Sequence, residues 1–155
     1  MKTSIVTSVE TAAFRAACEH RQALSVEVGG LDWNERFPGW LQRYESYYRT
    51  AFANQSAALL ICERGEGFVA SCIASIQDEF RRAVSGKGIG YVNGMYVKPA
   101  FRKQHVGTAL VAAAKEWLHE RGCSIVRLHP SCGANAFYRR LGFVPIEELE
   151  YHASS

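Results

Sequence analysis

The chain has 155 residues, of which 48% are hydrophobic and 21% are charged, and its net charge is +3. This length suits one domain, expected to span residues 1–155, and this composition excludes a disordered, collagen-like or repeat protein. The charge is too small to indicate nucleic acid as a partner.

Hydrophobic periodicity and turn residues predict that strands alternate with helices. In the first half we expect a strand at 3–9, helices at 10–25 and 34–54, and a hairpin of strands at 57–63 and 68–76 around the turn at 64–67. After a polar stretch at 77–88 we expect a strand at 90–97, a helix at 106–121, a strand at 123–129, a short helix at 135–141 and a last strand from 143–146. This order, β-α-α-β-β-β-α-β-α-β, predicts an α/β fold with a mixed central sheet. Two of its strands are expected to be parallel because a helix connects them.

The helix expected at 34–54 carries an unusually aromatic stripe. Its aromatic members, three to four residues apart, are Phe37, Trp40, Tyr44, Tyr47, Tyr48 and Phe52. Such a stripe is typical of core packing, and its width is consistent with a dimer face as well. The alternative is that part of it lines a substrate pocket. Pro38 is expected in the first turn of this helix or just before it, where proline is tolerated.

The segment from Val97 to Leu110 joins a strand end, a short basic loop and a helix start. The first turn of a helix leaves backbone N–H groups unpaired, and the helix dipole attracts anions to them. Arg102 and Lys103 add positive charge at this end, and Gly107 lets a ligand approach the backbone closely. Together these features predict a cradle for a pyrophosphate group.

Three motifs here resemble the GNAT superfamily of N-acetyltransferases. Arg102–Gly107 resembles the acetyl-CoA signature Arg/Gln-x-x-Gly-x-Gly/Ala, Met95–Pro99 resembles the family's hydrophobic-Tyr-Val-x-Pro strand end, and Asn135–Phe143 resembles its Ala-x-x-Phe/Leu-Tyr-x-x-x-Gly-Phe segment. The order of elements matches the family fold as well. The resemblance spans nearly the whole chain and is strongest from 90 to 145. It implies the GNAT acyl-CoA N-acyltransferase fold with splayed parallel strands.

One position departs from the signature, because His105 stands where the family has its first glycine. If the backbone there needs a glycine conformation, a Cβ atom would crowd the diphosphate. If the backbone is an ordinary helix start, any residue fits and the imidazole points away. We favour the second account.

The resemblance implies how acetyl-CoA binds. Its pantetheine arm would lie between the strands that end at Val97 and His129, and a bulge near Asn93 and Gly94 would aim a backbone N–H at the thioester carbonyl, where negative charge develops. The expected cofactor-binding residues are Met95, Tyr96, Val97, Arg102, Lys103, Gln104, His105, Val106, Gly107, Thr108 and Asn135. Tyr138 is the expected catalytic acid, which protonates the departing thiolate.

The resemblance also implies direct attack by a neutral amine, without an acyl-enzyme, so that a base or water must take a proton. The strand at 90–97 contains no carboxylate. We therefore expect a water relay, and His129, Glu27 and Asp32 are the alternative bases.

The acceptor side is expected among the first two helices. Trp33, Trp40, Tyr44 and His129 are the expected substrate-binding residues, because aromatic faces attract cationic amines. The acceptor is expected to be a small amine or an amino-acid-like metabolite, with a protein N-terminus or lysine as the alternative. A catalytically silent CoA-binding or regulatory module is the rival hypothesis, and a structural dimer module is a third.

The five cysteines include no CxxC pair and no spacing typical of a zinc site, so we expect reduced thiols and no metal. No apolar run reaches the roughly 20 residues of a membrane span, and no signal peptide is recognisable. We therefore expect a cytoplasmic protein that binds no membrane. A homodimer is compatible with all three functional hypotheses.

Overall fold

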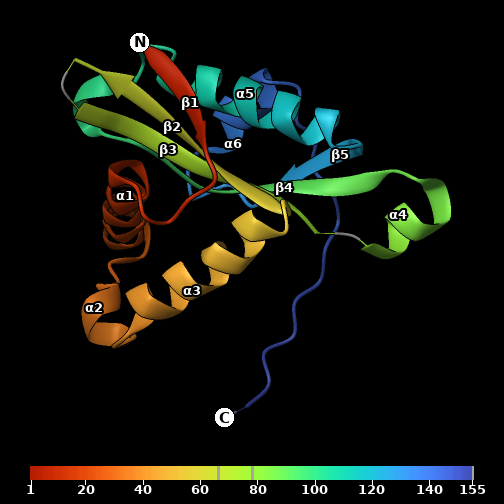
Figure 1. Cartoon of the computed structure of the whole chain (residues 1–155), viewed down its shortest axis with the longest axis horizontal. Helices are drawn as coiled ribbons and strands as arrows, with labels where there is room; N and C mark the ends of the chain where they lie inside the picture. Colours follow the sequence, from red (N-terminus) through yellow and green to blue (C-terminus); the bar gives the residue numbers. More distant parts are fainter. Residues whose placement is uncertain (66, 78, 155) are drawn as a thin grey trace.

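Five strands form one sheet in the computed structural model, which describes residues 1–65, 67–77 and 79–154 (Figure 1). The strands are β1 (Lys2–Val6), β2 (Ala57–Arg64), β3 (Gly67–Ile76), β4 (Gly88–Val97) and β5 (Cys123–Leu128), and they lie in this order across the sheet. Neighbours are antiparallel except for β4 and β5, which are parallel. The predicted mixed sheet with one parallel pair is confirmed.

Helices cover both faces of the sheet (Figure 1). One face carries α1 (Ala12–Gly29), α2 (Trp33–Arg36) and α3 (Trp40–Ala53), and the other carries α5 (Val106–Glu120) and α6 (Asn135–Arg140). The 3-10 turn η1 (Pro99–Phe101) precedes α5, and α4 (Glu79–Ser85) lies beside β4. Within the described residues, no helix is long and apolar enough to cross a membrane.

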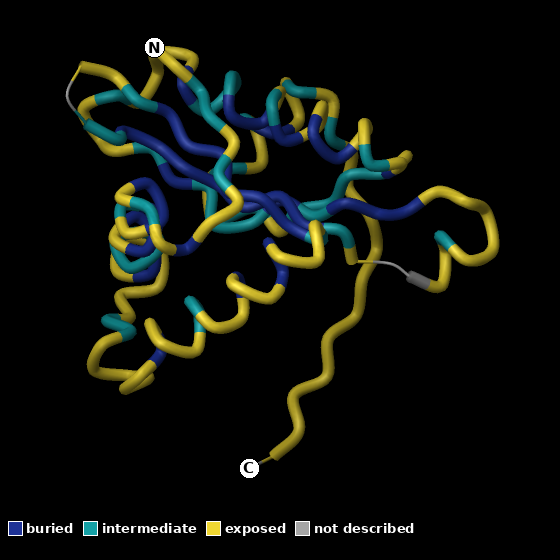
Figure 2. The backbone as a smooth tube through the Cα atoms, in the orientation of Figure 1, coloured by how far each residue is buried: buried dark blue, intermediate teal, exposed yellow. Residues whose placement is uncertain are grey.

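Burial on both faces explains the uninterrupted apolar run from 57 to 62 in β2. Strand side chains alternate between the two faces, so a strand covered on both needs apolar residues throughout. The even-numbered residues of this run pack in the core under α5, and the odd-numbered ones pack in the core under α1 and α3. None of the six is more than 1% exposed. Figure 2 shows this buried backbone along the central strands.

The helix expected over 34–54 is interrupted, so its predicted continuity is wrong. The structure divides it into α2 and α3, with Pro38 and Gly39 between them. Proline has no N–H to donate and restricts the residue before it. Gly39 has a φ of +77°, a left-handed conformation that glycine adopts without steric cost. The chain therefore turns at this point, and α3 begins in a new direction.

The last strand expected from 143–146 is also wrong. Residues 143–154 form neither helix nor strand, and nearly all of them are exposed. Pro145 lacks the N–H that pairing within a sheet requires. Figure 1 shows this tail leaving the body of the protein.

The polar stretch at 77–88, expected as a connection, contains the short helix α4. Residue 78 of that stretch and residue 66 of the expected hairpin turn lie outside the described residues. The other predicted helices and strands begin and end within a few residues of the observed ones.

An extra residue in β4 separates the two parallel strands. Ser71 of β3 faces Tyr96, whereas Ile73 faces Asn93, so two steps along β3 correspond to three along β4. Gly94 lies within this bulge and has a φ of +61°. Pairing between β4 and β5 ends at Val92, although β4 continues for five more residues to Val97. This confirms the splayed pair that the resemblance implied.

His20 joins α1 to the sheet beside this bulge. The side chain is 2% exposed, its Nδ1 lies 2.8 Å from the hydroxyl of Ser71, and its ring lies 5.4 Å from the ring of Tyr96. Burial lowers the pKa of His20 to about 4, and the charge of Lys98 contributes in the same direction. The imidazole is therefore neutral at physiological pH.

This buried histidine predicts a loss of stability in mild acid. Below a pH of about 6.5 the unfolded chain protonates His20, whereas the folded protein binds that proton only near pH 4. The folded state therefore loses about 2 to 3 kcal/mol as the pH falls from 6.5 to 4.5. Urea unfolding of the wild type and of His20→Gln at both pH values measures this difference. Equal acid sensitivity of the two proteins would contradict it.

Candidate active site

A cavity of about 500 Å³ opens where β4 and β5 separate, and we call it the bulge cavity. Its walls come from α1, from Trp33 at the start of α2, from the bulge at Asn93–Met95, from residues 129–132 after β5 and from Tyr138 of α6. The bulge thus both separates the strands and lines the space that this separation creates.

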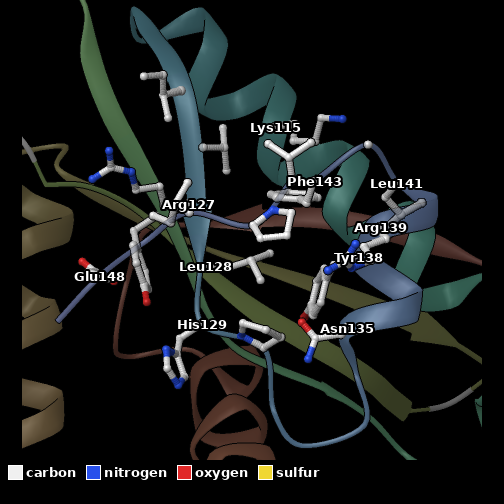
Figure 3. A pocket seen from close by; sticks show the side chains of 18 of the residues that line it. Lys115, Arg127, Leu128, His129, Asn135, Tyr138, Arg139, Leu141, Phe143 and Glu148 are labelled. Carbon is white, nitrogen blue, oxygen red and sulfur yellow. The ribbon is translucent and has the colours of Figure 1, made fainter. Parts of the chain in front are cut away.

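A second cavity, of about 670 Å³, lies along β5 between α6 and the tail, and we call it the edge cavity (Figure 3). Its walls are β5, α6 and residues 141–148. Tyr138 and His129 line both cavities. Figure 3 shows Asn135 and Tyr138 side by side on α6, with His129 just past the end of β5.

Tyr138 is held by aromatic contacts at the junction of the two cavities. Its ring lies 5.0 Å from that of Phe137 and 5.8 Å from that of Phe143, and the residue is 8% exposed. Burial, together with the nearby Cys72 thiol, raises the pKa of Tyr138 to about 12. The phenol therefore keeps its proton at neutral pH and has one to donate.

The backbone before α5 differs from the expected ordinary helix start. Lys103 has a φ of +59° and His105 a φ of +62°, so both adopt the left-handed conformation that favours glycine. The account that we favoured for His105 is therefore wrong, and this position needs a glycine-like backbone. The His105 side chain is exposed and makes no capping hydrogen bond to the first turn of α5.

Arg102 clamps the end of β4 to α1. Its Nε donates to the carbonyl of Val97 at 2.9 Å, its terminal nitrogen pairs with Glu27 at 2.7 Å, and its guanidinium lies 5.7 Å from the ring centre of Tyr96. The hydrogen bond from Arg102 lowers the pKa of Glu27, which makes this carboxylate a weak proton acceptor.

Other cradle residues also bind within the protein. Gln104 donates to the carbonyl of Ala100 at 2.9 Å and accepts a hydrogen bond from Arg64. A Cβ atom on Gly107 would lie 3.2 Å from the Phe137 ring, so this glycine lets α6 approach α5 closely. Val106 is buried and Thr108 is half-buried. An anion at this loop would therefore bind mainly to the backbone at the start of α5 and to the exposed Lys103.

The predicted acceptor residues separate into two groups. Trp33 lines the bulge cavity, whereas Trp40 and Tyr44 do not. Trp40 lies behind Trp33, with ring centres 5.2 Å apart, and Tyr44 lies 5.6 Å beyond Trp40 and packs on Phe14. Most of the aromatic stripe thus belongs to the core between α3 and α1.

The acidic candidates for the base lie outside the bulge cavity. Glu27 pairs with Arg102, while Asp32 accepts hydrogen bonds from the Gln22 amide at 2.6 Å and from the backbone of Asn34 at 2.8 Å. His129 remains in contact with both cavities. No group of three or more His, Cys, Asp or Glu side chains in the described part of the chain is arranged to hold a metal ion.

Sequence reasoning missed Arg21 and passed over Cys132, which both line the bulge cavity. Arg21 lies seven residues after Phe14, and therefore on the same buried face of α1. The signal that could have revealed Arg21 is a charged residue at a position where the helical pattern expects an apolar one. Cys132 is the exposed cysteine of the chain, and the other four are buried.

The parted parallel strands leave an unpaired strand edge beside a helix start, an arrangement that suits an extended, anionic ligand. The family model described as "Acetyltransferase (GNAT) family" matches residues 25–143. The chain belongs to this family and is an acetyl-CoA-dependent N-acetyltransferase of the GNAT type.

Individual proteins resemble this chain in sequence or in fold. An aminoglycoside N(6')-acetyltransferase type 1 from Acinetobacter haemolyticus is 25% identical over 129 residues, covering 81% of this chain and 86% of that protein. A GCN5-related N-acetyltransferase from Ralstonia eutropha JMP134 has the same fold, with a TM-score of 0.83, 20% identity and coverage of 98% and 97% of the two chains. A protein from Clostridium acetobutylicum described as a "predicted acetyltransferase", crystallised with acetyl-CoA, has the same fold, with a TM-score of 0.78, 16% identity and coverage of 98% and 95%.

The left-handed backbone at His105 predicts a stabilising substitution. His105→Gly relieves a conformation that costs a residue with a Cβ atom about 1 to 2 kcal/mol. The greater freedom of glycine in the unfolded chain offsets part of this gain, so we expect a net increase of about 0.5 to 1 kcal/mol. Urea unfolding measures the change. His105→Ala is the matched control, because it removes the imidazole but keeps the strain; equal stability of the two variants would show that the backbone is not the cause.

Proposed function

We propose that this chain transfers the acetyl group of acetyl-CoA directly to a primary amine held in the bulge cavity, without an acyl-enzyme. The observation that carries the proposal is the separation of β4 from β5 beyond Val92, which leaves the β4 backbone from Asn93 to Val97 unpaired on its β5 side. That free edge ends beside the start of α5.

The residues present fit acetyl-CoA. The backbone of Met95, Tyr96 and Val97 would pair with the pantetheine arm, Asn135 would bind it from α6, and the first turn of α5 with Lys103 would bind the diphosphate. Bound there, acetyl-CoA supplies an activated acetyl group as a thioester. Arg102 would act chiefly by fixing the strand end, since its guanidinium already binds Val97 and Glu27.

The proposed transfer forms a carbon–nitrogen bond, breaks a carbon–sulfur bond and moves one proton from the amine to the sulfur. The amine nitrogen would bond to the thioester carbon that acetyl-CoA supplies, and a backbone N–H at the bulge would stabilise the charge on the carbonyl oxygen. Tyr138 would donate its proton to the leaving sulfur, and its raised pKa keeps that proton on the phenol at neutral pH until then. The proton of the amine leaves through water, because Glu27 and Asp32 are engaged elsewhere. His129, which lines the bulge cavity together with Tyr138, would receive this proton and return it through water to the Tyr138 phenolate.

A small amine or an amino-acid-like metabolite is the proposed acceptor. A volume of about 500 Å³ is within the range of small-molecule sites, which is about 300 to 1,000 Å³. The Acinetobacter relative is named for aminoglycosides, which carry several positive charges. Among the described residues, no carboxylate lines the bulge cavity to bind such charges. The experiments below would reveal two alternatives. One is an enzyme that acetylates a protein N-terminus or lysine, and the other is a catalytically silent CoA-binding module.

The cytoplasmic location and the homodimer stay predictions. The aromatic stripe no longer supports a dimer face, because Trp40, Tyr48 and Phe52 are buried within the protein. In the described sheet the outer edges of β1 and β5 have no neighbouring strand, and we propose one of these edges as the surface for a second copy instead. Unpaired strand edges are ready templates for association.

Acetyl-CoA binding is the first test of the proposed function. Calorimetric titration is expected to give a dissociation constant in the micromolar range (about −8 kcal/mol). Release of free CoA thiol in the presence of an amine panel then measures transfer. Gly107→Glu is expected to abolish binding, because its side chain would meet Phe137 and Val97 and push α6 and the end of β4 away from the start of α5. Thermal unfolding checks that this variant folds.

A second variant separates folding from binding in this test. Lys103→Glu reverses an exposed charge at the cradle and is expected to weaken acetyl-CoA binding without changing the fold. Unchanged affinity in both variants would place the cradle elsewhere. Binding without thiol release from any amine would support the silent module.

Tyr138→Phe tests the proposed acid. The variant keeps the ring packed between Phe137 and Phe143 but removes the proton donor, so kcat is expected to fall about 10- to 1,000-fold. The affinity for acetyl-CoA is expected to stay within about threefold of the wild type. Steady-state thiol release and calorimetry measure the two quantities. A variant with wild-type kcat would rule out this role.

A further inference from the structure

The bulge cavity has an unusual charge for a site expected to bind an amine. The lining residues that the structure describes include no aspartate or glutamate, and Arg21 is their one arginine or lysine. An ammonium group alone gains nothing from such a wall, because the nearest fixed charge repels it. The charge of this cavity therefore favours an acceptor that carries another group besides the amine.

Arg21 is directed at the reacting end of the cavity. Its Cζ lies 4.2 Å from the centre of the Trp33 ring, so the guanidinium stacks over this ring. Its Cδ lies 3.4 Å from the point where a Cβ on Gly94 would be, which places the side chain beside the bulge. Stacking fixes a guanidinium plane while its N–H edges stay free to bind an anion.

No anion among the described residues neutralises Arg21. Within the described residues, no carboxylate lies within the 4.0 Å of an ion pair with it. The titratable groups that interact with its charge are the phenols of Tyr44 and Tyr48, and burial raises the pKa of both, so they are neutral. Half-buried charges are normally paired, and here the described part of the chain supplies no such partner.

We propose that Arg21 binds an anionic group of the acceptor, a carboxylate or a phosphate, and that the substrate is therefore a small amine that also carries a negative charge. This inference rests on the proposed function and specifies its acceptor. Because Arg21 lies beside Gly94, where the amine meets the thioester, the amine and the anion are only a few bonds apart. An α-amino acid or a phosphorylated amino alcohol has this arrangement.

The same side chain gives specificity by repulsion. An amine with a second positive charge would place it near Arg21 without a carboxylate to offset the contact. An acceptor with an anion instead gains a charge-assisted, two-pronged contact, which arginine makes with planar carboxylates and with phosphates. Arg21 is thus a specificity-determining residue for the acceptor.

Matched pairs of amines test this proposal. Thiol release is compared for phenylalanine against 2-phenylethylamine, and for O-phosphoethanolamine against ethanolamine, so that each pair differs in the anionic group. We expect the wild type to prefer the anionic member of at least one pair by about 10- to 100-fold in kcat/KM, the range for a hydrogen bond to a charged group. The two pairs distinguish carboxylate from phosphate.

Arg21→Gln is expected to reduce that preference to near one, and Arg21→Lys to restore part of it. A merely structural role would change both members of a pair equally and leave their ratio intact. Arg15→Gln, an exposed arginine on the same helix, is the control and is expected to keep the wild-type ratio. A wild-type ratio near one in both pairs, or an unchanged ratio in Arg21→Gln, would overturn the proposal.

Binding measurements distinguish a failure of this proposal from a failure of the catalytic proposal. Calorimetric titration of the same four compounds into the CoA-bound protein measures the preference without any transfer. Preferential binding of an anionic compound that Arg21→Gln removes would support the role of Arg21 in a protein that releases no thiol. Equal binding of each pair would contradict it, whether or not acetyl groups are transferred.

Discussion

The one extra residue in β4 is the constraint on which the rest of the site depends. Two parallel strands joined by a crossover helix normally stay paired along their length. Here the bulge at Gly94 turns β4 away from β5 beyond Val92, and two cavities meet in the space that opens. The opening is stable because the sheet is covered on both faces, so that the strands part without exposing the cores beneath them.

Contacts from α1 hold the separated strand in place. His20 packs on Tyr96 and contacts Ser71, while Glu27, two turns further along the helix, binds Arg102, whose side chain holds the end of β4 at Val97. The first contact is buried and the second is near the surface. The helix that carries Arg21 is thus fixed to the strand that would carry the cofactor, so the acceptor and cofactor sides of the site share one rigid wall.

The sequence predicted most of this fold because local patterns decide it. The apolar run in β2, the helix after His105 and the motif around Tyr138 each contain the information for their own structure. The errors arose where the local conformation depends on the surrounding structure. They concern the left-handed backbone at His105, the break at Gly39 and the unpaired tail after Gly142. Arg21 was missed because only the packed structure brings it against Trp33 and Gly94.

The placement of the cysteines makes the site the chemically vulnerable point of the protein. Cys132 is exposed in the wall of the bulge cavity, whereas the other four thiols are buried and burial raises the pKa of Cys18 and Cys72 to about 12. Thiolates are the forms that oxidants and alkylating reagents attack. Oxidative damage would therefore reach the wall of the bulge cavity before the core, and a single covalent label would report on that wall alone.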